Sequence, residues 1–250
     1  MKFHIFGSKD APKMILIHGV LTPWQIWDEQ ITHFSEKYHV IVVALNAHVE
    51  GKDSKFVSIE KEAECIEAYC GENYSNEVFV VCGLSMGGTI AYTLWKNQKI
   101  RIRYLIMDSA PLVPYGKIMT NIMTKSYIDI IYKSKARDPK VIKAFKRDFL
   151  PEKFLESYLH IADQMSDESI RNMVTSISNS TLCAEVPKSE TKILYIHGTK
   201  ANEILSIKSA KRMKKHYAKI NVVCCKGYAH CYKAIYEPTE WIKIVEAFIE

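Results

Sequence analysis

Residues that break or cross-link a chain are scarce in this sequence, and the long apolar run of a membrane helix is missing. The 250 residues include only 10 Gly and 8 Pro, which excludes collagen-like and low-complexity architectures. No apolar run approaches the ~18 residues that a bilayer-spanning helix needs. The first 13 residues are also too polar for a signal peptide. We therefore expect no stable membrane insertion.

Cysteines are few, and motifs for metals and cofactors are missing. Seven Cys is an odd number, in a chain too large to depend on disulfides, so we expect reduced thiols and a cytoplasmic protein. Cys224-Cys225 and His230-Cys231 superficially resemble a metal cluster, but adjacent residues on a strand point to opposite faces. The sequence has neither a GxGxxG fingerprint nor a GxxxxGK[ST] loop. We therefore predict no metal and no cofactor.

The overall composition is that of an ordinary globular protein. Hydrophobic residues make up 48% and charged residues 25%, and a chain of this length buries roughly three quarters of its unfolded surface. The formal net charge of +6 is concentrated in residues 117–153, which hold ten Lys/Arg and four Asp/Glu. Such a segment either attracts anionic ligands or forms a solvated helical face. No nucleic-acid-binding motif accompanies it, so we expect no nucleic-acid partner.

Short apolar runs of the β type alternate with longer helical patterns. Most runs are near-continuous Val, Ile and Leu, which is typical of parallel strands buried on both faces. This alternation predicts an α/β fold with a mostly parallel central sheet flanked by helices, to which residues 2–6 could add an antiparallel edge. The predicted strands are residues 14–18, 40–45, 78–82, 104–107, 193–197 and 222–225, and the predicted helices are residues 24–37, 58–70, 87–97, 207–217 and 238–249.

The alternation stops between residues 112 and 190, where no buried strand is predicted. Apolar residues from Ile118 to Ile131 instead recur at i, i+3 and i+4, as on one face of a helix. Further helices fit residues 139–149, 151–165 and 167–178. We therefore predict a core of residues 1–111 and 191–250, with an all-helical insertion at 112–190. The Met- and Ile-rich face of the first helix packs onto the core, lines an apolar pocket, or does both.

The sharpest motif is Gly83-Leu84-Ser85-Met86-Gly87, a G-x-S-x-G sequence between a predicted strand and a predicted helix. A nucleophilic serine must project from a tight turn, and glycines two residues before and after it let the strand and helix backbones pass closely. The start of the helix also favours negative charge that develops near Ser85. The motif predicts Ser85 as a nucleophile.

Two further elements fit this chemistry. Ile17-His18-Gly19-Val20 ends the first buried strand, and a turn there can direct the Val20 amide toward an oxyanion, together with the Met86 amide. His230 follows the last predicted strand in Gly227-Tyr228-Ala229-His230. A histidine C-terminal to the serine suits a general base.

In this order, the motifs resemble those of the α/β-hydrolase superfamily of serine hydrolases, in its lidded esterase- or lipase-like branch. The resemblance covers nearly the whole chain and implies an α/β-hydrolase fold whose helical cap corresponds to residues 112–190. It implies Ser85 as nucleophile, His230 as base, and the Val20 and Met86 amides as oxyanion hole. It does not identify the substrate, because this fold supports many reactions.

The sequence departs from the family at the third catalytic residue. The acid usually lies three residues after a Gly that follows the second-last strand, and Ala201 occupies that position here. Glu203 lies two residues further on. Asp108 ends the strand that follows the Ser85 helix, a place that some members of the superfamily use for the acid. We prefer Asp108 and keep Glu203 as the alternative.

The leading hypothesis is hydrolysis of a carboxylic ester of a small or medium apolar molecule through an acyl-enzyme. A second hypothesis keeps the same residues for acyl transfer, thioester or amide cleavage, or carbon–carbon hydrolysis. A third is a non-catalytic ligand-binding relative that has lost its acid, as Ala201 would suggest. The expected partner is a small ester-like molecule, and the oligomeric state is open.

Overall fold

Seven strands form one central sheet in the computed structural model of the chain. The structure describes residues 1–51, 54–217 and 219–250. The strand order is β1-β3-β2-β4-β5-β6-β7, with β1 antiparallel to β3 and every other pair parallel. The strands are β1 (Lys2–Phe6), β2 (Lys13–Ile17), β3 (His39–Ala44), β4 (Glu77–Leu84), β5 (Arg101–Asp108), β6 (Lys192–His197) and β7 (Asn221–Cys224). The six predicted strands are confirmed, and residues 2–6 form the antiparallel edge that the sequence allowed.

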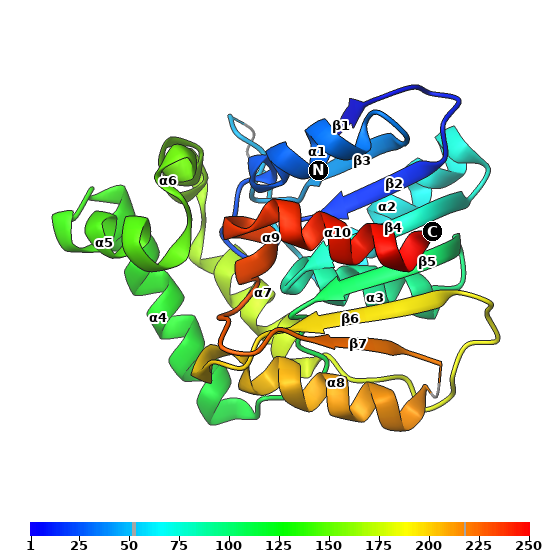
Figure 1. Cartoon of the computed structure of the whole chain (residues 1–250). Helices are drawn as coiled ribbons and strands as arrows, with labels where there is room; N and C mark the ends of the chain where they lie inside the picture. The colour runs from blue at the N-terminus through cyan, green and yellow to red at the C-terminus, as the bar shows by residue number, and fades with distance from the viewer. Residues whose placement is uncertain (52–53, 218) are drawn as a thin grey trace.

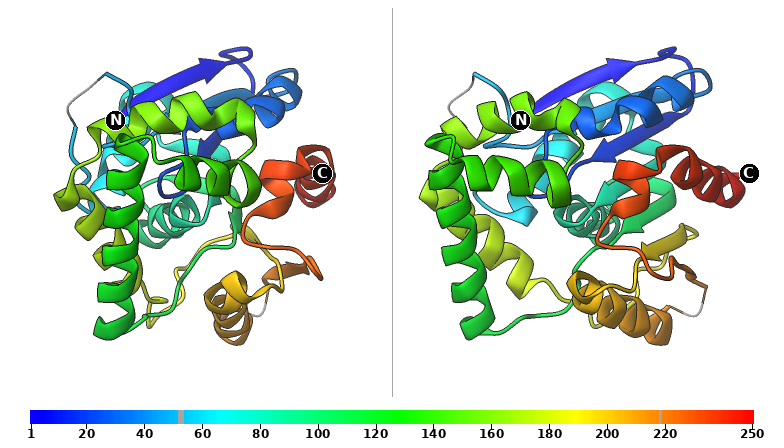
Figure 2. Two further views of the ribbon diagram at one scale, coloured as in Figure 1. Left: turned by 90° about the vertical axis from the view of Figure 1, so that its left-hand side faces the viewer. Right: turned by 60° about the vertical axis from the view of Figure 1, so that its left-hand side comes forward.

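Helices cover both faces of this sheet because its central strands are apolar on both sides. Helices α1 and α10 pack together on one face, and α2 and α3 pack together on the other (Figures 1 and 2). The core helices are α1 (Asp28–Phe34), preceded by the 3-10 turn η1 (Trp24–Trp27), α2 (Ile59–Tyr74), α3 (Met86–Asn97), α8 (Ile204–His216), α9 (Tyr232–Tyr236) and α10 (Pro238–Ile249). The short helix α9 was not predicted. None of the helices in the described ranges is long and apolar enough to cross a membrane.

Four helices connect β5 to β6 and lie beyond the carboxyl ends of the parallel strands (Figure 1). The elements are α4 (Lys117–Lys135), α5 (Pro139–Ala144) with the π-turn η2 (Phe145–Phe149), the 3-10 turn η3 (Glu152–Phe154), α6 (Leu155–Gln164) and α7 (Asp167–Asn179). The prediction that residues 112–190 contain helices and no strand agrees with this description. We call residues 112–190 the helical segment.

Side-chain caps fix where several of these helices begin. Asp138 accepts hydrogen bonds from the Lys140 and Val141 amides, and Pro139 occupies the first turn of α5. Ser166 accepts from the Ser169 amide at the start of α7. The Ser169 hydroxyl in turn accepts from the amide of the fully buried Phe56. The cap of α7 therefore lies against the loop before α2, so the helical segment is joined to the core.

The turn between β4 and α3 leaves no space for side chains at two glycines. A Cβ on Gly83 would lie 2.2 Å from the Gly87 carbonyl oxygen, and a Cβ on Gly87 would lie 2.3 Å from the Ile17 carbonyl oxygen of β2. These distances are far shorter than van der Waals contact. Helix α3 can therefore begin directly behind the sheet only because both positions are glycine.

We predict that Gly87→Ala destabilises the protein by about 3 kcal/mol or more, because its methyl group would meet backbone atoms that cannot move independently. For a domain of this size the loss of Tm is on the order of 6–12 °C, measurable by thermal unfolding. Gly71→Ala in α2 is the matched control. Its Cβ would meet only the movable side chain of Asn76, at 3.2 Å, and alanine favours helix. Equal Tm values for the two variants would contradict the steric argument.

Candidate active site

Ser85 occupies the turn between β4 and α3 in a backbone conformation that is rare for residues with a side chain. Its φ is 52° and its ψ is −117°, and its amide donates a 2.8 Å hydrogen bond to the Asp108 carbonyl at the end of β5. Such strained conformations persist only where the surroundings enforce them, and they cluster at functional sites. The glycine packing and this hydrogen bond together project the Ser85 side chain beyond the sheet.

His230 reaches Ser85 from the loop that follows β7. Its Nε2 atom lies 2.9 Å from Ser85 Oγ, a normal hydrogen-bond length. The loop is anchored to the loop after β6, because the Thr199 and Lys200 amides both donate to the Tyr228 carbonyl. A Cβ on Gly198 would lie 2.2 Å from that same carbonyl oxygen. Two loops far apart in sequence therefore hold the ring in place.

Glu203 supplies the carboxylate beside His230. It ends the 3-10 turn η4 (Ala201–Glu203) and is fully buried, whereas Ala201 is exposed. Its Oε1 atom lies 3.3 Å from His230 Nδ1, an ion-pair distance somewhat longer than the ~2.9 Å of a typical N–H···O bond. One turn of 3-10 helix thus brings a glutamate to the ring although the usual acid position holds alanine.

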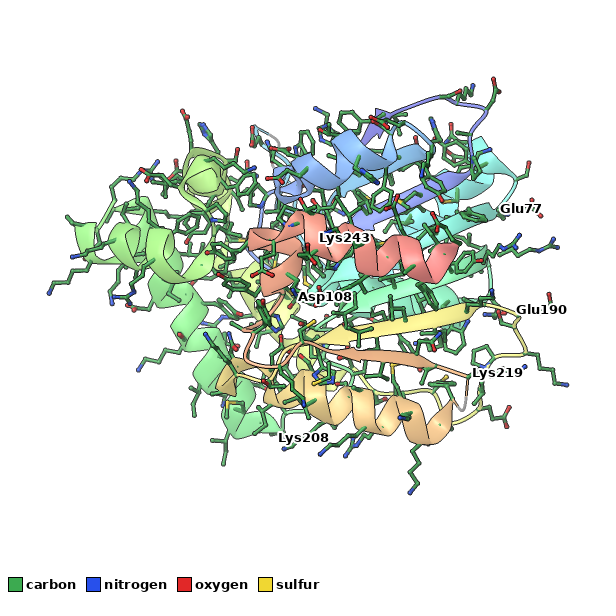
Figure 3. The ribbon with its side chains drawn as sticks, viewed as in Figure 1. Glu77, Asp108, Glu190, Lys208, Lys219 and Lys243 are labelled. Carbon is green, nitrogen blue, oxygen red and sulfur yellow. The ribbon has the colours of Figure 1, made fainter. Side chains whose placement is uncertain are left out.

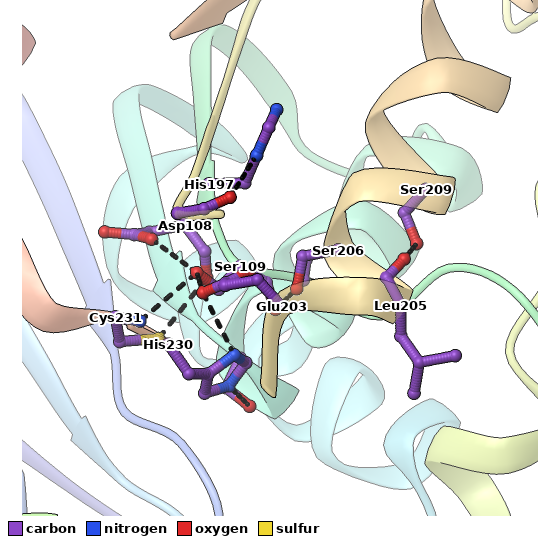
Figure 4. Close-up of polar contacts among 12 residues, drawn as sticks. Asp108, Ser109, His197, Glu203, Leu205, Ser206, Ser209, His230 and Cys231 are labelled. Carbon is purple, nitrogen blue, oxygen red and sulfur yellow. Dashed lines mark hydrogen bonds and ion pairs between the residues drawn. The ribbon is translucent and has the colours of Figure 1, made fainter. Parts of the chain in front are cut away.

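Asp108, the acid preferred from the sequence, has other partners. Its Oδ2 accepts from Trp241 Nε1 at 3.0 Å, and its Oδ1 lies 2.9 Å from the Ser109 hydroxyl. Within the described part of the chain, the carboxylate in ion-pair contact with His230 is that of Glu203. The geometry therefore favours the alternative acid over the preferred one. The sequence did not indicate a role for Ser109 or Trp241, because no motif marks them. Asp108 lies at the end of β5 (Figure 3), and Ser109 lies beside it (Figure 4).

Opposing effects set the charge of the His230–Glu203 pair. Burial alone would lower the pKa of His230, but the Cys231 side chain and the Glu203 carboxylate act in the opposite direction, and the pKa lies well above its usual 6.5. Burial raises the pKa of the Cys231 thiol and keeps it neutral, so we attribute the increase mainly to Glu203. Burial also raises the pKa of Glu203, but contacts with His230, Ser109 and Ser206 outweigh it, and the net shift is downward. Glu203 is therefore the ionised partner of the ring.

The turn after β2 lies directly beside Ser85. A Cβ on Gly19 would be 3.3 Å from Ser85 Cβ, and Val20 and Ser85 line the same pocket. Met86 is the first residue of α3, where amides at a helix N-terminus lack intrahelical acceptors. The Val20 and Met86 amides are thus on the two segments that flank the serine, and their role as an oxyanion hole stays a prediction.

A pocket of about 620 Å³ opens over Ser85 and His230. Helix α4 supplies one wall through Met119, Met123 and Tyr127. Ile118 and Ile122 on the same helix are 80% and 58% exposed. The apolar face predicted for this helix is therefore divided, since part of it lines the pocket and part of it faces solvent. The wall from α8 includes Ile204, Leu205 and Lys208.

The basic residues of 117–153 and the cysteines are the other charged and sulfur-containing groups that the sequence singled out. Among the described contacts of residues 117–153, the side chains of Lys133, Arg137, Lys146 and Lys153 form exposed ion pairs, so part of the positive charge is neutralised locally. All seven cysteines are free thiols. Within residues 1–51, 54–217 and 219–250, no group of three or more His, Cys, Asp or Glu side chains could hold a metal ion.

Comparison with solved structures identifies the architecture as the α/β-hydrolase fold. An α/β hydrolase family protein from Desulfitobacterium hafniense superposes with a TM-score of 0.79 over 100% of both chains, at 18% identity. An esterase from Thermogutta terrifontis superposes with a TM-score of 0.75 over 99% of this chain and 92% of its own, at 15% identity. The resemblance to the superfamily that the motifs carry is confirmed at the level of the fold.

Two curated proteins match part of the sequence, and no family model matches it. The pimeloyl-[acyl-carrier protein] methyl ester esterase of Nitrosomonas europaea is 26% identical over 104 residues, which are 42% of this chain and 39% of that protein. Epoxide hydrolase 3 of Xenopus tropicalis is 29% identical over 118 residues, 44% of this chain and 31% of that protein. The matched parts thus span between about a third and two fifths of these relatives.

We predict that the His230 ring titrates above pH 6.5 and that Glu203→Gln lowers its pKa, because the substitution removes the negative charge that favours the imidazolium. NMR-monitored titration of the ring in both proteins measures the shift. Asp108→Asn is the control and should change the His230 pKa much less. A larger decrease in Asp108→Asn than in Glu203→Gln would show that Asp108 is the charged partner.

Proposed function

We propose that the chain is a serine hydrolase that cleaves a carboxylic ester through an acyl-enzyme, with Ser85 as nucleophile, His230 as general base and Glu203 as the acid. The observation that carries the proposal is the chain of contacts from Ser85 Oγ to His230 Nε2, at 2.9 Å, and from His230 Nδ1 to Glu203 Oε1, at 3.3 Å. This chain lies at the base of a pocket large enough for a small substrate. The esterases among the similar proteins support the same reaction class.

Each group has a defined task in the reaction. Ser85 Oγ attacks the ester carbonyl carbon while His230 Nε2 takes its proton, and Glu203 stabilises the resulting imidazolium. The amides of Val20 and Met86 donate to the oxyanion of the tetrahedral intermediate. The intermediate collapses as His230 returns the proton to the leaving alcohol. A water molecule, deprotonated by His230, then attacks the acyl-serine, and the acid is released as His230 returns the proton to Ser85 Oγ.

The pocket lining supports an apolar substrate of small or medium size. Met119, Met123 and Tyr127 give one wall a largely apolar surface, which favours a hydrocarbon group through the hydrophobic effect. A second, apolar cavity of about 370 Å³ is lined mainly by residues of α4, α5, η2 and α6 and shares Tyr127 with the first. In this proposal the helical segment is the cap of the site, on a core of residues 1–111 and 191–250.

The buried position of Glu203 argues against a non-catalytic binding protein. The case for such a protein depended on Ala201, which occupies the family's usual acid position. A fully buried carboxylate beside the imidazole supplies the missing group from two residues further on. A binding protein would gain nothing from a buried charge at this point, whereas a general base needs it to hold the ring tautomer.

We predict that Ser85→Ala reduces ester hydrolysis by several orders of magnitude while the protein stays folded, because no other group can form the acyl-enzyme. Hydrolysis of p-nitrophenyl esters measures the loss. A fluorophosphonate probe should label the parent protein at Ser85 and leave the variant unlabelled. Failure to label the folded parent at high probe concentration would refute the proposed function.

We predict that Met123→Trp shifts preference toward short acyl or alcohol groups, because the larger side chain fills part of the pocket beside Tyr127. The ratio of kcat/KM for butanoyl to acetyl esters of the same alcohol should fall by about tenfold, the effect of losing burial for about two methylenes. Ile122→Trp is the matched control, since Ile122 is 58% exposed on the same helix and does not line the pocket. Similar changes in both variants would contradict the assigned wall.

A further inference from the structure

Two buried carboxyl groups meet at one hydroxyl behind the His230 ring. Ser109 Oγ lies 2.6 Å from Glu203 Oε1 and 2.9 Å from Asp108 Oδ1. The relative exposures of Asp108, Ser109 and Glu203 are 2%, 0% and 0%. Figure 4 shows the three side chains converging beside His230. The serine therefore connects the carboxylate of the proposed site to a second carboxyl group that the proposed mechanism does not use.

The number of available protons determines which group donates and which accepts in each of these hydrogen bonds. A hydroxyl has one proton to donate and can accept two hydrogen bonds. The shorter contact assigns the Ser109 proton to Glu203 Oε1, and the Cys231 amide donates to Ser109 Oγ at 3.2 Å. One acceptor position on Ser109 remains, and Asp108 can fill it only if its own oxygen carries a proton.

The other carboxyl oxygen of Asp108, Oδ2, already accepts a hydrogen bond. Trp241 Nε1 has a proton to give and no capacity to accept, and it lies 3.0 Å from Asp108 Oδ2. A neutral Asp108 with its proton on Oδ1 therefore completes the network, with each proton between one donor and one acceptor. An ionised Asp108 would instead leave two buried negative charges competing for the single Ser109 proton.

The pKa shifts of the two carboxyl groups agree with a neutral Asp108 beside an ionised Glu203. Burial and then the charge of Glu203 raise the pKa of Asp108 to about 7, while that of Glu203 lies below its usual value. When two carboxyl groups share a site, one is commonly held neutral. The titratable groups that face Asp108 are Glu203 of η4, His230 and Cys231 before α9, Tyr195 of β6 and Cys225 after β7.

The backbone holds the connecting residues in unusual conformations. Ser109 and Cys231 both have left-handed φ values, 56° and 52°, although neither is glycine. The Ser109 amide donates to the Ile196 carbonyl of β6 at 2.8 Å, which fixes the turn. Two strained residues in direct contact indicate that this arrangement is enforced by the surrounding fold.

We propose that Asp108 is a neutral carboxylic acid that donates its proton to Ser109, and that Ser109 in turn fixes the ionised Glu203 against His230. Asp108 and Ser109 are thus positioning residues, and the inference rests on the proposed function of the site. Its distinctive consequence is that asparagine can replace Asp108. The amide nitrogen donates to Ser109 as the acid does, and the amide oxygen accepts from Trp241.

The first test compares Asp108→Asn, Asp108→Ala and Ser109→Ala by ester hydrolysis. We expect Asp108→Asn to retain kcat/KM within about threefold, since an amide reproduces the hydrogen bonds of a neutral acid. Asp108→Ala and Ser109→Ala should each lose about tenfold or more in kcat, the effect of one hydrogen bond to a charged group. A loss on the order of 10⁴-fold in folded Asp108→Asn, as expected for a charged triad acid, would overturn the proposal.

The pH profile gives a second readout that a merely structural residue would not change. Asp108 is neutral below its pKa, so the network is intact at lower pH and is lost as the pH rises through that value. The parent protein should therefore lose kcat/KM on the alkaline side of its optimum, and Asp108→Asn should lack this decrease. Identical alkaline limbs in the two proteins would contradict the proton assigned to Asp108.

Infrared spectroscopy tests the proton without any turnover. With ¹³C-labelled aspartate, the parent protein should show the C=O stretching band of a protonated carboxyl group at a pH just below 7, where ordinary aspartates are ionised, and Asp108→Asn should lack it. The band should persist in Ser85→Ala, which has no nucleophile. If the parent shows no such band, the proposal is wrong even if Ser85 is labelled by the probe. If the band is present and Ser85 is not labelled, the proposed function fails alone.

Discussion

The hydrogen bond from the Ser85 amide to the Asp108 carbonyl, together with the glycine contacts beneath it, is the constraint on which the site depends. It joins the turn after β4 to the last residue of β5 and holds Ser85 at φ 52°. Without side chains at Gly83 and Gly87, α3 begins at the sheet surface and the serine projects from it. The other functional groups are positioned relative to this fixed point, because each follows the carboxyl end of a parallel strand.

Besides the turn after β4, four other strand ends supply the candidate site, and the local structure differs at each of them. The turn after β2 brings Gly19 against Ser85. A left-handed Ser109 follows β5, one turn of 3-10 helix follows β6, and a loop anchored at Tyr228 follows β7. Several buried polar groups at these ends are hydrogen-bonded to one another, as the Ser109 hydroxyl is to Glu203 and to the Cys231 amide. The low dielectric that strengthens these contacts also makes any missing partner costly, so the arrangement specifies one geometry.

The sheet, its antiparallel edge and the turn that carries Ser85 can be predicted from the sequence because each depends on a local residue pattern. Near-continuous apolar runs mark buried strands, and glycines at fixed spacing mark a close backbone approach. The position of Glu203 depends instead on a 3-10 turn that no periodicity reveals. The choice between Glu203 and Asp108 depends on where two loops meet, 94 residues apart in the case of Ser109 and Glu203. Contacts of that range are set by tertiary packing. The division of the apolar face of α4 between pocket and solvent could not be predicted for the same reason. Residue spacing does not distinguish side chains that line a pocket from side chains that face solvent.

The placement of the helical segment between neighbouring strands has a consequence for how such a protein can diversify. Strands β5 and β6 pair in parallel register from Tyr104 with Lys192 to Asp108 with Ile196, whatever the chain does between them. Because the entropy of closing a loop rises only slowly with its length, residues can be added to or removed from this connection at small thermodynamic expense. The side of the pocket formed by Met119, Met123 and Tyr127 can therefore change shape while Ser85, His230 and Glu203 keep their separations. Under the proposed function, the residues that select the substrate and the residues that react with it therefore lie in parts of the chain that can evolve independently.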